Sequence, residues 1–204
     1  VIGVAVGGVR PRVLIDEMGA GTAYTNWDGS GFSQGAEEGT HPDFWSVIRG
    51  EQNSTLQGFD IDGSKLLDPH LSWWPGIYYG GIFVSVADSG EFKVSDCEII
   101  DWHDEICLAA PLGKKVRARI TGCVLRDAWP FSDISTTPEF ESDWGHAGMW
   151  VVGNGILRVH ATGTTFKTCH DGVELDRNVE GNIGFTAVNC RFEDTENGVE
   201  TGGD

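Results

Sequence analysis

Apolar and polar positions recur along this chain in a repeat that contains two short phrases. The first phrase has eight residues, of which the first six are an apolar residue, two turn positions, a small or apolar residue, an exposed position and another apolar residue. It occurs as LQGFDIDG (56–63), VSDCEIID (94–101), ITGCVLRD (120–127), ATGTTFKT (161–168) and AVNCRFED (187–194). Because polarity alternates within it, the phrase predicts a short strand with one buried face.

A six-residue phrase follows each of these segments. It reads YGGIFV (79–84), HDEICL (103–108), HAGMWV (146–151), HDGVEL (170–175) and ENGVET (196–201). Uninterrupted repeats recur every 26 residues, which is a period typical of solenoids, where each repeat stacks on the next. The repeat therefore predicts that equivalent strands lie side by side, one in each turn of the chain, or rung.

A third strand is expected between each six-residue phrase and the next eight-residue phrase. Its segments are GEFKVS (90–95), VRARIT (116–121), ILRVHA (156–161) and NIGFTA (182–187). The third position of the first phrase holds residues that tolerate left-handed backbone angles. These residues are Gly58, Asp96, Gly122, Gly163 and Asn189. Three short strands per rung, without sustained helical periodicity, predict an all-β fold and a parallel β-helix.

With these strands and turns the chain resembles the right-handed parallel β-helix superfamily, the pectin-lyase-like proteins. That class includes pectate lyases, polygalacturonases, alginate epimerases and viral tailspikes, and the resemblance implies a right-handed coil. We expect a single domain over residues 1–204, with an irregular first rung and a long loop in 1–50 and regular rungs in 51–204. The sequence stops inside a rung without a polar cap, so we expect a fragment or a module that other chains continue.

Two rungs carry aromatic-rich insertions directly before the six-residue phrase, at residues 64–78 and 128–145. The tryptophans in or beside them are Trp73, Trp74, Trp102, Trp129, Trp144 and Trp150. Aromatic faces beside carboxylates such as Glu174 suit sugar rings, whose hydroxyls need acceptors. We therefore expect a glycan cleft on this face. Packing of the insertions onto the strands and a contact between protein chains are the alternatives.

Histidines and aspartates occupy fixed positions in the six-residue phrase. His103, His146 and His170 share its first position, and Asp104 and Asp171 share its second. Two rungs separate the aspartates, or about 10 Å between backbones, which is near the carboxyl separation of about 6.5–9.5 Å in inverting glycosidases. We predict Asp104 and Asp171 as catalytic acids, with His146 or His170 orienting a carboxylate or a hydroxyl.

The phrases HDGVEL, HDEICL and GHAGMWV resemble the strand motifs of polygalacturonase-type glycoside hydrolases. By register, the resemblance implies that Asp104 and Asp171 are the catalytic acids, with His146 one position away from the family histidine. The order of the motifs differs, however, and the family's R-x-K substrate clamp has no counterpart in this sequence. The resemblance thus implies the fold and the location of a site more directly than the reaction.

The column that contains His103, His146 and His170 has other interpretations. Imidazoles and carboxylates are ligands for transition metals, but a ladder in one line does not converge on a point, so we predict no metal site there and no required cofactor. Calcium is chemically compatible with the acid-rich face, although no calcium-loop signature occurs. Alternatively, His103 and His170 only end a turn and donate hydrogen bonds to backbone carbonyls in successive rungs.

The amino-acid composition disfavours some classes of binding partner. It has 31 acidic and 14 basic residues and a formal net charge of -17, which disfavours nucleic acid and anionic membranes. A surface so charged suits a salty medium, where ions screen the repulsion. No apolar run is long enough to span a membrane. Three of the five cysteines, Cys97, Cys123 and Cys190, share one inward position, and a Cys97–Cys123 disulfide is geometrically possible.

Three functions remain open from the sequence. The first is a glycan-binding module of a cell or virion surface, similar to a tailspike, tail fibre or adhesin and able to form a homotrimer or a larger assembly. The second is an extracellular polysaccharide hydrolase or lyase. The third is a structural spike whose repeats supply length and rigidity. Because few basic residues lie near the histidine face, a neutral glycan is favoured over an anionic one.

Overall fold

The computed structural model describes residues 2–4, 9–14, 43–50, 53–63, 77–85, 89–100, 104–110, 112–128, 147–153, 155–177 and 181–202. Within these ranges every element is a β-strand. The strands are β1 (Arg12–Leu14), β2 (Asp43–Gly50), β3 (Thr55–Gln57), β4 (Asp60–Asp62), β5 (Ile77–Ser85), β6 (Gly90–Ser95), β7 (Glu98–Ile100), β8 (Asp104–Ala109), β9 (Lys115–Thr121), β10 (Val124–Arg126), β11 (Ala147–Gly153), β12 (Ile156–Thr162), β13 (Thr165–Arg177), β14 (Asn182–Val188) and β15 (Arg191–Gly202). The described chain offers no helix that is long and apolar enough to cross a membrane.

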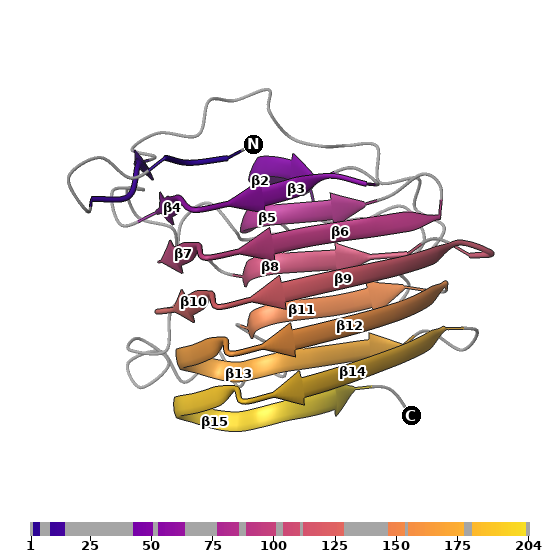
Figure 1. Cartoon of the computed structure of the whole chain (residues 1–204). Coiled ribbons are helices and arrows are strands. Elements are labelled where there is room, and N and C mark those ends of the chain that lie inside the picture. Colours follow the sequence, from indigo (N-terminus) through magenta and orange to yellow (C-terminus); the bar gives the residue numbers. More distant parts are fainter. Residues whose placement is uncertain are drawn as a thin grey trace.

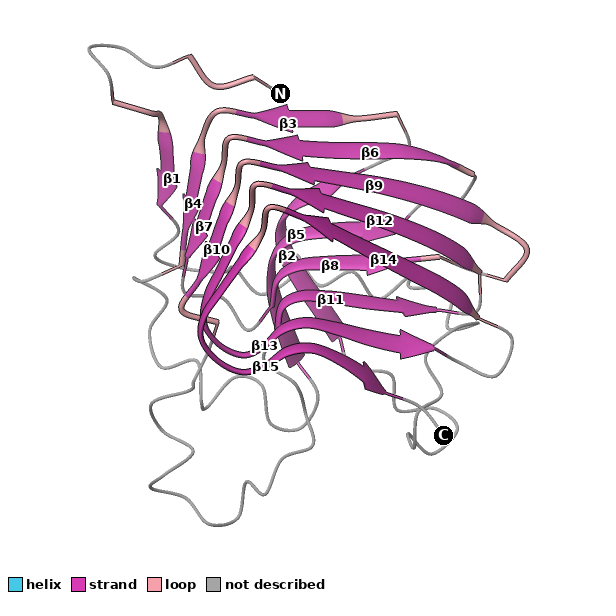
Figure 2. Ribbon diagram, turned by 60° about the horizontal axis from the view of Figure 1, so that its bottom comes forward, coloured by secondary structure: helices cyan, strands magenta, loops and turns pink. Residues whose placement is uncertain are grey.

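The strands form two parallel sheets, so the predicted all-β class is confirmed (Figure 1). One sheet has five strands in the order β14-β12-β9-β6-β3. The other has ten strands in the order β1-β4-β7-β10-β13-β11-β8-β5-β2, with β15 paired to β13. Figure 2 shows β13 and β15 curving from one arm of this second sheet to the other, so the sheet is curled. The arrangement is compatible with a solenoid.

The register of the strands follows the repeat in the sequence. In the five-stranded sheet, Val94 pairs with Ile120, which pairs with Ala161, which pairs with Ala187. The strands of the first phrase stack in the same way, from β4 through β7 and β10 to the start of β13 and then β15. Equivalent strands therefore lie side by side, as the repeat predicts.

Alternating burial places the apolar positions inside. In β9, exposed and buried residues alternate without exception, and Val116, Ala118 and Ile120 enter the core. Large rings fill the interior: Phe166 is fully buried and stacks on Phe192 of the next rung, with ring centroids 5.0 Å apart. Because such a core repeats along the stack, each rung is stabilised chiefly by its neighbours.

Two columns of left-handed residues turn the chain between strands. The first column is the predicted one, and all five of its residues have positive φ angles between 54° and 75°. A second column, at the last position of the first phrase, contains Asp127, Thr168 and Asp194 with φ angles of 62°, 52° and 53°. The sequence did not point to this column because one of its residues, Thr168, is β-branched and unfavourable at such an angle.

The cysteine column faces the interior, as predicted. Cys97 and Cys123 are buried and are free thiols, so they form no disulfide in this structure. A hydrogen bond from the neighbouring Cys123 lowers the pKa of Cys97 to about 7. The same bond, together with burial, raises the pKa of Cys123.

The early part of the chain contains a strand where a loop was expected. Residues 43–50 form β2, which pairs in parallel with β5 from Asp43 and Ile77 onward. The segment DFWSVIRG matches the six-residue phrase poorly, so the repeat did not identify it. Most of the two predicted insertions, residues 64–76 and 129–145, lies outside the described residues.

Candidate functional site

The described structure contains some of the predicted site residues. His170, Asp171 and Glu174 lie on β13, and Trp150 lies on β11; Asp104 is described by its backbone, at the start of β8. The other predicted site residues lie outside the described part of the chain. They are His146, Trp73, Trp74, Trp102, Trp129 and Trp144.

The aspartate column has the predicted register. Gly80 pairs with Asp104, Ala147 with Asp171, and Asp171 with Asn197. Since β8 and β11 pair in the same register at Ile106 and Met149, Ala147 lies between the two aspartates in the column. Their backbones are therefore two strand spacings apart, or about 10 Å. The catalytic roles of Asp104 and Asp171 stay a prediction.

A second column runs three positions further along these strands. Cys107 pairs with Trp150, Trp150 with Glu174, and Glu174 with Glu200. Trp150, Glu174 and Glu200 are partly exposed, whereas Cys107 is fully buried. Among the residues of this column whose burial the structure describes, the accessible ones are therefore one indole followed by two carboxylates.

A bend at Gly172 brings the two columns together. A side chain at Gly172 would point at the interior, because a Cβ there would overlap a ring carbon of Phe192. Val173 also belongs to the core, so the two consecutive residues Gly172 and Val173 face inward. Asp171 and Glu174, which flank this pair in the sequence, therefore lie on the opposite face of the strand. The next rung repeats this arrangement.

Four side chains meet at this bend, and we name them the His170 cluster: His170, Asp171, Glu196 and Glu200. The Nδ1 atom of His170 lies 3.0 Å from Oδ2 of Asp171, and its Nε2 atom lies 3.2 Å from Oε2 of Glu196. Asp171 is only 1% exposed, and its other oxygen, Oδ1, has no hydrogen-bond partner in the described structure. One imidazole thus connects a buried carboxylate to an exposed one.

Glu200 lies against Asp171, although both are acids. Burial raises the pKa of Glu200, and its contact with Asp171 raises that pKa further. The amide of Asn197 donates a hydrogen bond of 3.1 Å to Oε2 of Glu200 and holds it in place. Two carboxylates in contact repel each other unless they share a proton or a cation.

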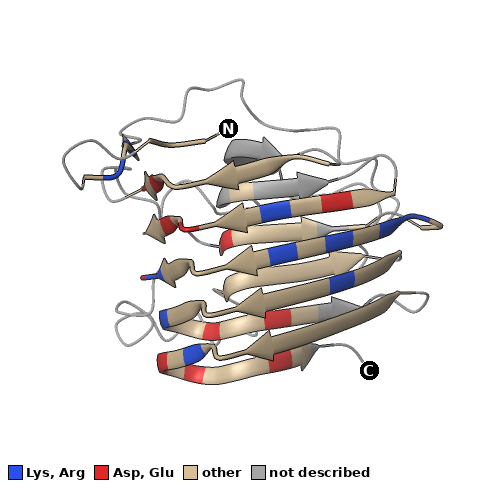
Figure 3. Cartoon of the chain, viewed as in Figure 1, with Lys and Arg blue, Asp and Glu red and all other residues tan. Residues whose placement is uncertain are grey.

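No arginine or lysine of the described structure pairs with Asp171, Glu196 or Glu200. Figure 3 shows that acidic residues recur along β13 and β15, whereas basic residues gather mainly on β6, β9 and β12 of the other sheet. His170 is therefore the one basic group that the described chain brings to this cluster. The local charge is strongly negative whenever this imidazole is neutral.

The distances limit the chemistry of this cluster. One ligand-capable atom each of His170, Asp171 and Glu200 lies within 4.8 Å of the other two. Asp171 and Glu200 also contact each other directly, so the pair is placed to share a proton or a cation.

Sequence reasoning placed Glu196 and Glu200 in the correct columns but did not include them among the site residues. The available signal was the stacking of ENGVET directly after HDGVEL, which sets Glu196 beside His170 and Glu200 beside Glu174. What the pattern could not show was the bend at Gly172. That bend lets Glu200 reach Asp171, three positions away from its own partner in the ladder.

A further carboxylate that the sequence did not single out is Glu105. It is fully buried on β8, in the column that continues through Gly148, Gly172 and Gly198. Burial raises the pKa of the nearby Cys169 thiol, and the charge of Glu105 raises it further. This side chain lies in the interior and belongs to the packing of the bend rather than to its accessible surface.

Comparisons with known proteins give no match: no family model matches the sequence, no curated protein matches it, and no solved structure matches it.

Proposed function

We propose that this chain is a right-handed parallel β-helix of the pectin-lyase-like type that binds a neutral polysaccharide, as a module of a cell surface or a virion. Stacked parallel strands, a curled sheet and left-handed residues at equivalent turns support this fold. The observation that carries the binding function is the partly exposed column of Trp150, Glu174 and Glu200.

This column offers the two kinds of contact that a sugar needs. The indole of Trp150 supplies an apolar face for the C–H side of a pyranose ring, and the carboxylates supply acceptors for its hydroxyl groups. Adjacent strands are about 4.8 Å apart, so the three side chains present a regular row to an extended polymer. The acidic residues on β13 and β15 favour a neutral glycan over an anionic one, because like charges repel.

The test is a titration of the protein with soluble neutral and acidic polysaccharides, followed by intrinsic tryptophan fluorescence and by calorimetry. We expect a neutral glycan to bind and the Trp150→Ala variant to bind it at least about fivefold more weakly, since stacking on an aromatic ring contributes about 1 kcal/mol or more. The matched control is His160→Ala, which removes an exposed ring from the outer face of β12. Equal affinity of parent and Trp150→Ala, or the absence of binding to every glycan, contradicts the proposal.

A polysaccharide hydrolase or lyase is the second candidate, supported by the shared column of Asp104 and Asp171. Incubation with the same polysaccharides, with and without Ca²⁺, separates the outcomes. New reducing ends indicate hydrolysis, an unsaturated ultraviolet-absorbing product indicates a lyase, and retention without products indicates a binding module. Cleavage that persists in both Asp104→Asn and Asp171→Asn removes these residues as catalysts, and a chain that neither binds nor cleaves is a structural spike.

A further inference from the structure

We propose that His170, Asp171 and Glu200 bind one divalent transition-metal ion of the Zn²⁺ or Mn²⁺ type. The site shares Glu200 with the row proposed for glycan binding, but it needs neither Trp150 nor a polysaccharide, so metal binding and glycan binding can be tested separately. Two of its ligands come from β13 and the third from β15, so the ion connects neighbouring strands.

The geometry of the three ligands supports a single ion. One donor atom of each residue lies within 4.8 Å of the other two. Ligands bound at about 2.0–2.2 Å from one ion lie about 3–4 Å from each other. The proposal requires the partly exposed His170 and Glu200 side chains to rotate toward the buried Asp171 by the small remaining distance.

The buried carboxylate of Asp171 is an independent indication of a ligand. Its Oδ1 atom is buried and has no hydrogen-bond partner among the described residues, although Asp171 is 1% exposed. A buried carboxylate oxygen without a partner is costly, because it has lost water without gaining another contact. A cation bound between Asp171 and Glu200 supplies that contact and removes the repulsion between the two acids.

The surroundings of His170 also match those of a metal ligand. Its Nδ1 atom faces Asp171 at 3.0 Å, and its Nε2 atom faces the carboxylate of Glu196 at 3.2 Å. In metal sites the second nitrogen of a ligating imidazole usually donates to a carboxylate, which fixes the tautomer and the ring orientation. Glu196 has this position relative to His170 and can accept a hydrogen bond from Nε2, so Nδ1, which faces Asp171, is the nitrogen placed to bind the ion.

The donor set favours a transition metal over calcium. Calcium takes six to eight oxygen ligands, whereas imidazole nitrogen combined with carboxylate oxygen suits zinc, manganese and similar ions. Three protein ligands leave at least one position for water or another small ligand. The buried Asp171 therefore closes one side of the site to solvent, and the partly exposed Glu200 leaves the other side accessible.

The experiment measures binding of Zn²⁺, Mn²⁺ and Ca²⁺ to the chelator-treated chain by calorimetry, with the visible spectrum of bound Co²⁺ as a report on the ligands. We expect one Zn²⁺ or Mn²⁺ ion per chain and a rise in melting temperature. His170→Ala and Glu200→Gln are expected to weaken binding at least about 100-fold, and Glu196→Gln about tenfold, because it removes only the support of the imidazole.

Matched controls separate this site from the general acidity of the surface. His160→Ala removes another histidine, and Glu193→Gln removes another acid of β15; both should leave the affinity unchanged. Circular dichroism checks that each variant is folded. Binding that is unaffected by His170→Ala, a preference for Ca²⁺, or the absence of Zn²⁺ and Mn²⁺ binding at millimolar concentration overturns the proposal. None of these results depends on whether a glycan binds.

Discussion

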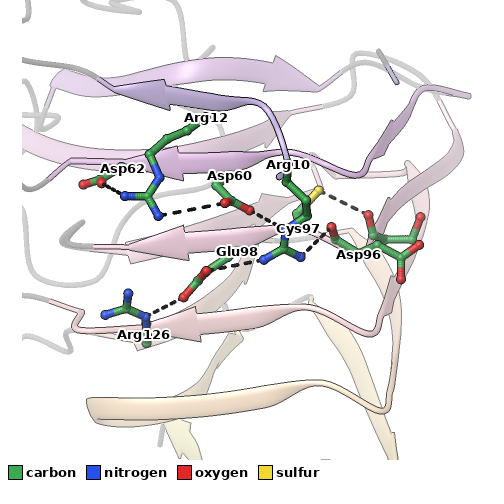
Figure 4. A network of polar contacts seen from close by, with 9 residues as sticks. Arg10, Arg12, Asp60, Asp62, Asp96, Cys97, Glu98 and Arg126 are labelled. Carbon is green, nitrogen blue, oxygen red and sulfur yellow. Dashed lines mark hydrogen bonds and ion pairs between the residues drawn. The ribbon is translucent and has the colours of Figure 1, made fainter. Parts of the chain in front are cut away.

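Carboxylates lie on adjacent strands in two regions of the molecule, at Asp60 and Glu98 on β4 and β7 and at Asp171 and Glu200 on β13 and β15, but only the first region neutralises them with arginines. Figure 4 shows this first group, which we name the arginine ladder: Arg10, Arg12, Asp60, Asp62, Glu98 and Arg126. Arg10 lies 3.0 Å from Asp60 and 3.4 Å from Glu98. Arg126 lies 2.7 Å from the other oxygen of Glu98.

The difference between the two groups indicates different roles. In the arginine ladder each carboxylate has a cation within ion-pair distance, so its charges connect β4, β7 and β10 and stabilise the stack. In the His170 cluster the carboxylates are in contact with each other and with one imidazole. Retaining mutually repelling acids costs stability, and such groups gather where a ligand, a proton or a cation is bound. This contrast supports the proposal that the His170 cluster, rather than the arginine ladder, binds a cation.

The largest expected effect comes from the glycine that shapes the bend of the His170 cluster. In Gly172→Ala the new methyl group overlaps the ring of Phe192 and meets the carbonyl oxygen of Gly198 at 2.7 Å. We expect a loss of about 2–3 kcal/mol in the free energy of unfolding, because an overpacked interior must shift. Gly198→Ala is the matched control, since its nearest contact, with Phe192, is an ordinary 3.6 Å. Urea unfolding measures both, and equal stabilities contradict the assigned bend.

Removing one charge from each group should change stability in opposite directions. Asp60→Asn leaves Arg10 and Arg12 beside a buried neutral amide, and we expect a loss of about 1–3 kcal/mol. Glu200→Gln removes the repulsion with Asp171, and we expect a gain of about 0.2–1 kcal/mol when a chelator excludes metals. Urea unfolding in chelator gives both values. A loss in both variants would show that the carboxylates of the His170 cluster are as well compensated as those of the ladder.

The smallest effect concerns Glu91 on β6, whose carboxylate is paired with basic residues like the carboxylates of the arginine ladder. Hydrogen bonds from Arg119 and Lys93 lower its pKa from 4.5 to about 2. Because the pKa is lower in the folded state, this stabilisation is present above pH 4.5 and is lost as the pH falls toward 2. The difference in unfolding free energy between the parent and Glu91→Gln should therefore shrink in acid. A difference that is constant with pH contradicts this account, and Glu193→Gln serves as the control.

Much of the fold follows from local sequence pattern. Alternation of apolar residues in 116–121 fixes which side chains face the core. The first column of turns is fixed by the five equivalent turn residues Gly58, Asp96, Gly122, Gly163 and Asn189. Because the pattern repeats, it also fixes the register that sets Ala147 between Asp104 and Asp171. The second column of turns could not be predicted from the sequence, since Thr168 has no local preference for its left-handed angle.

The sequence by itself determined the parallel strands, their stacking and the columns to which His170, Asp171 and Glu200 belong, because each depends on a short periodic pattern. Only the tertiary structure decided which acidic side chains lie beside a basic side chain and which lie beside another acid. Arg10 reaches Glu98 across 88 residues of sequence, and Glu200 reaches Asp171 because two inward residues bend the strand between the columns. Such contacts depend on the packing of distant segments, and no local pattern of polarity encodes the distance between two side chains.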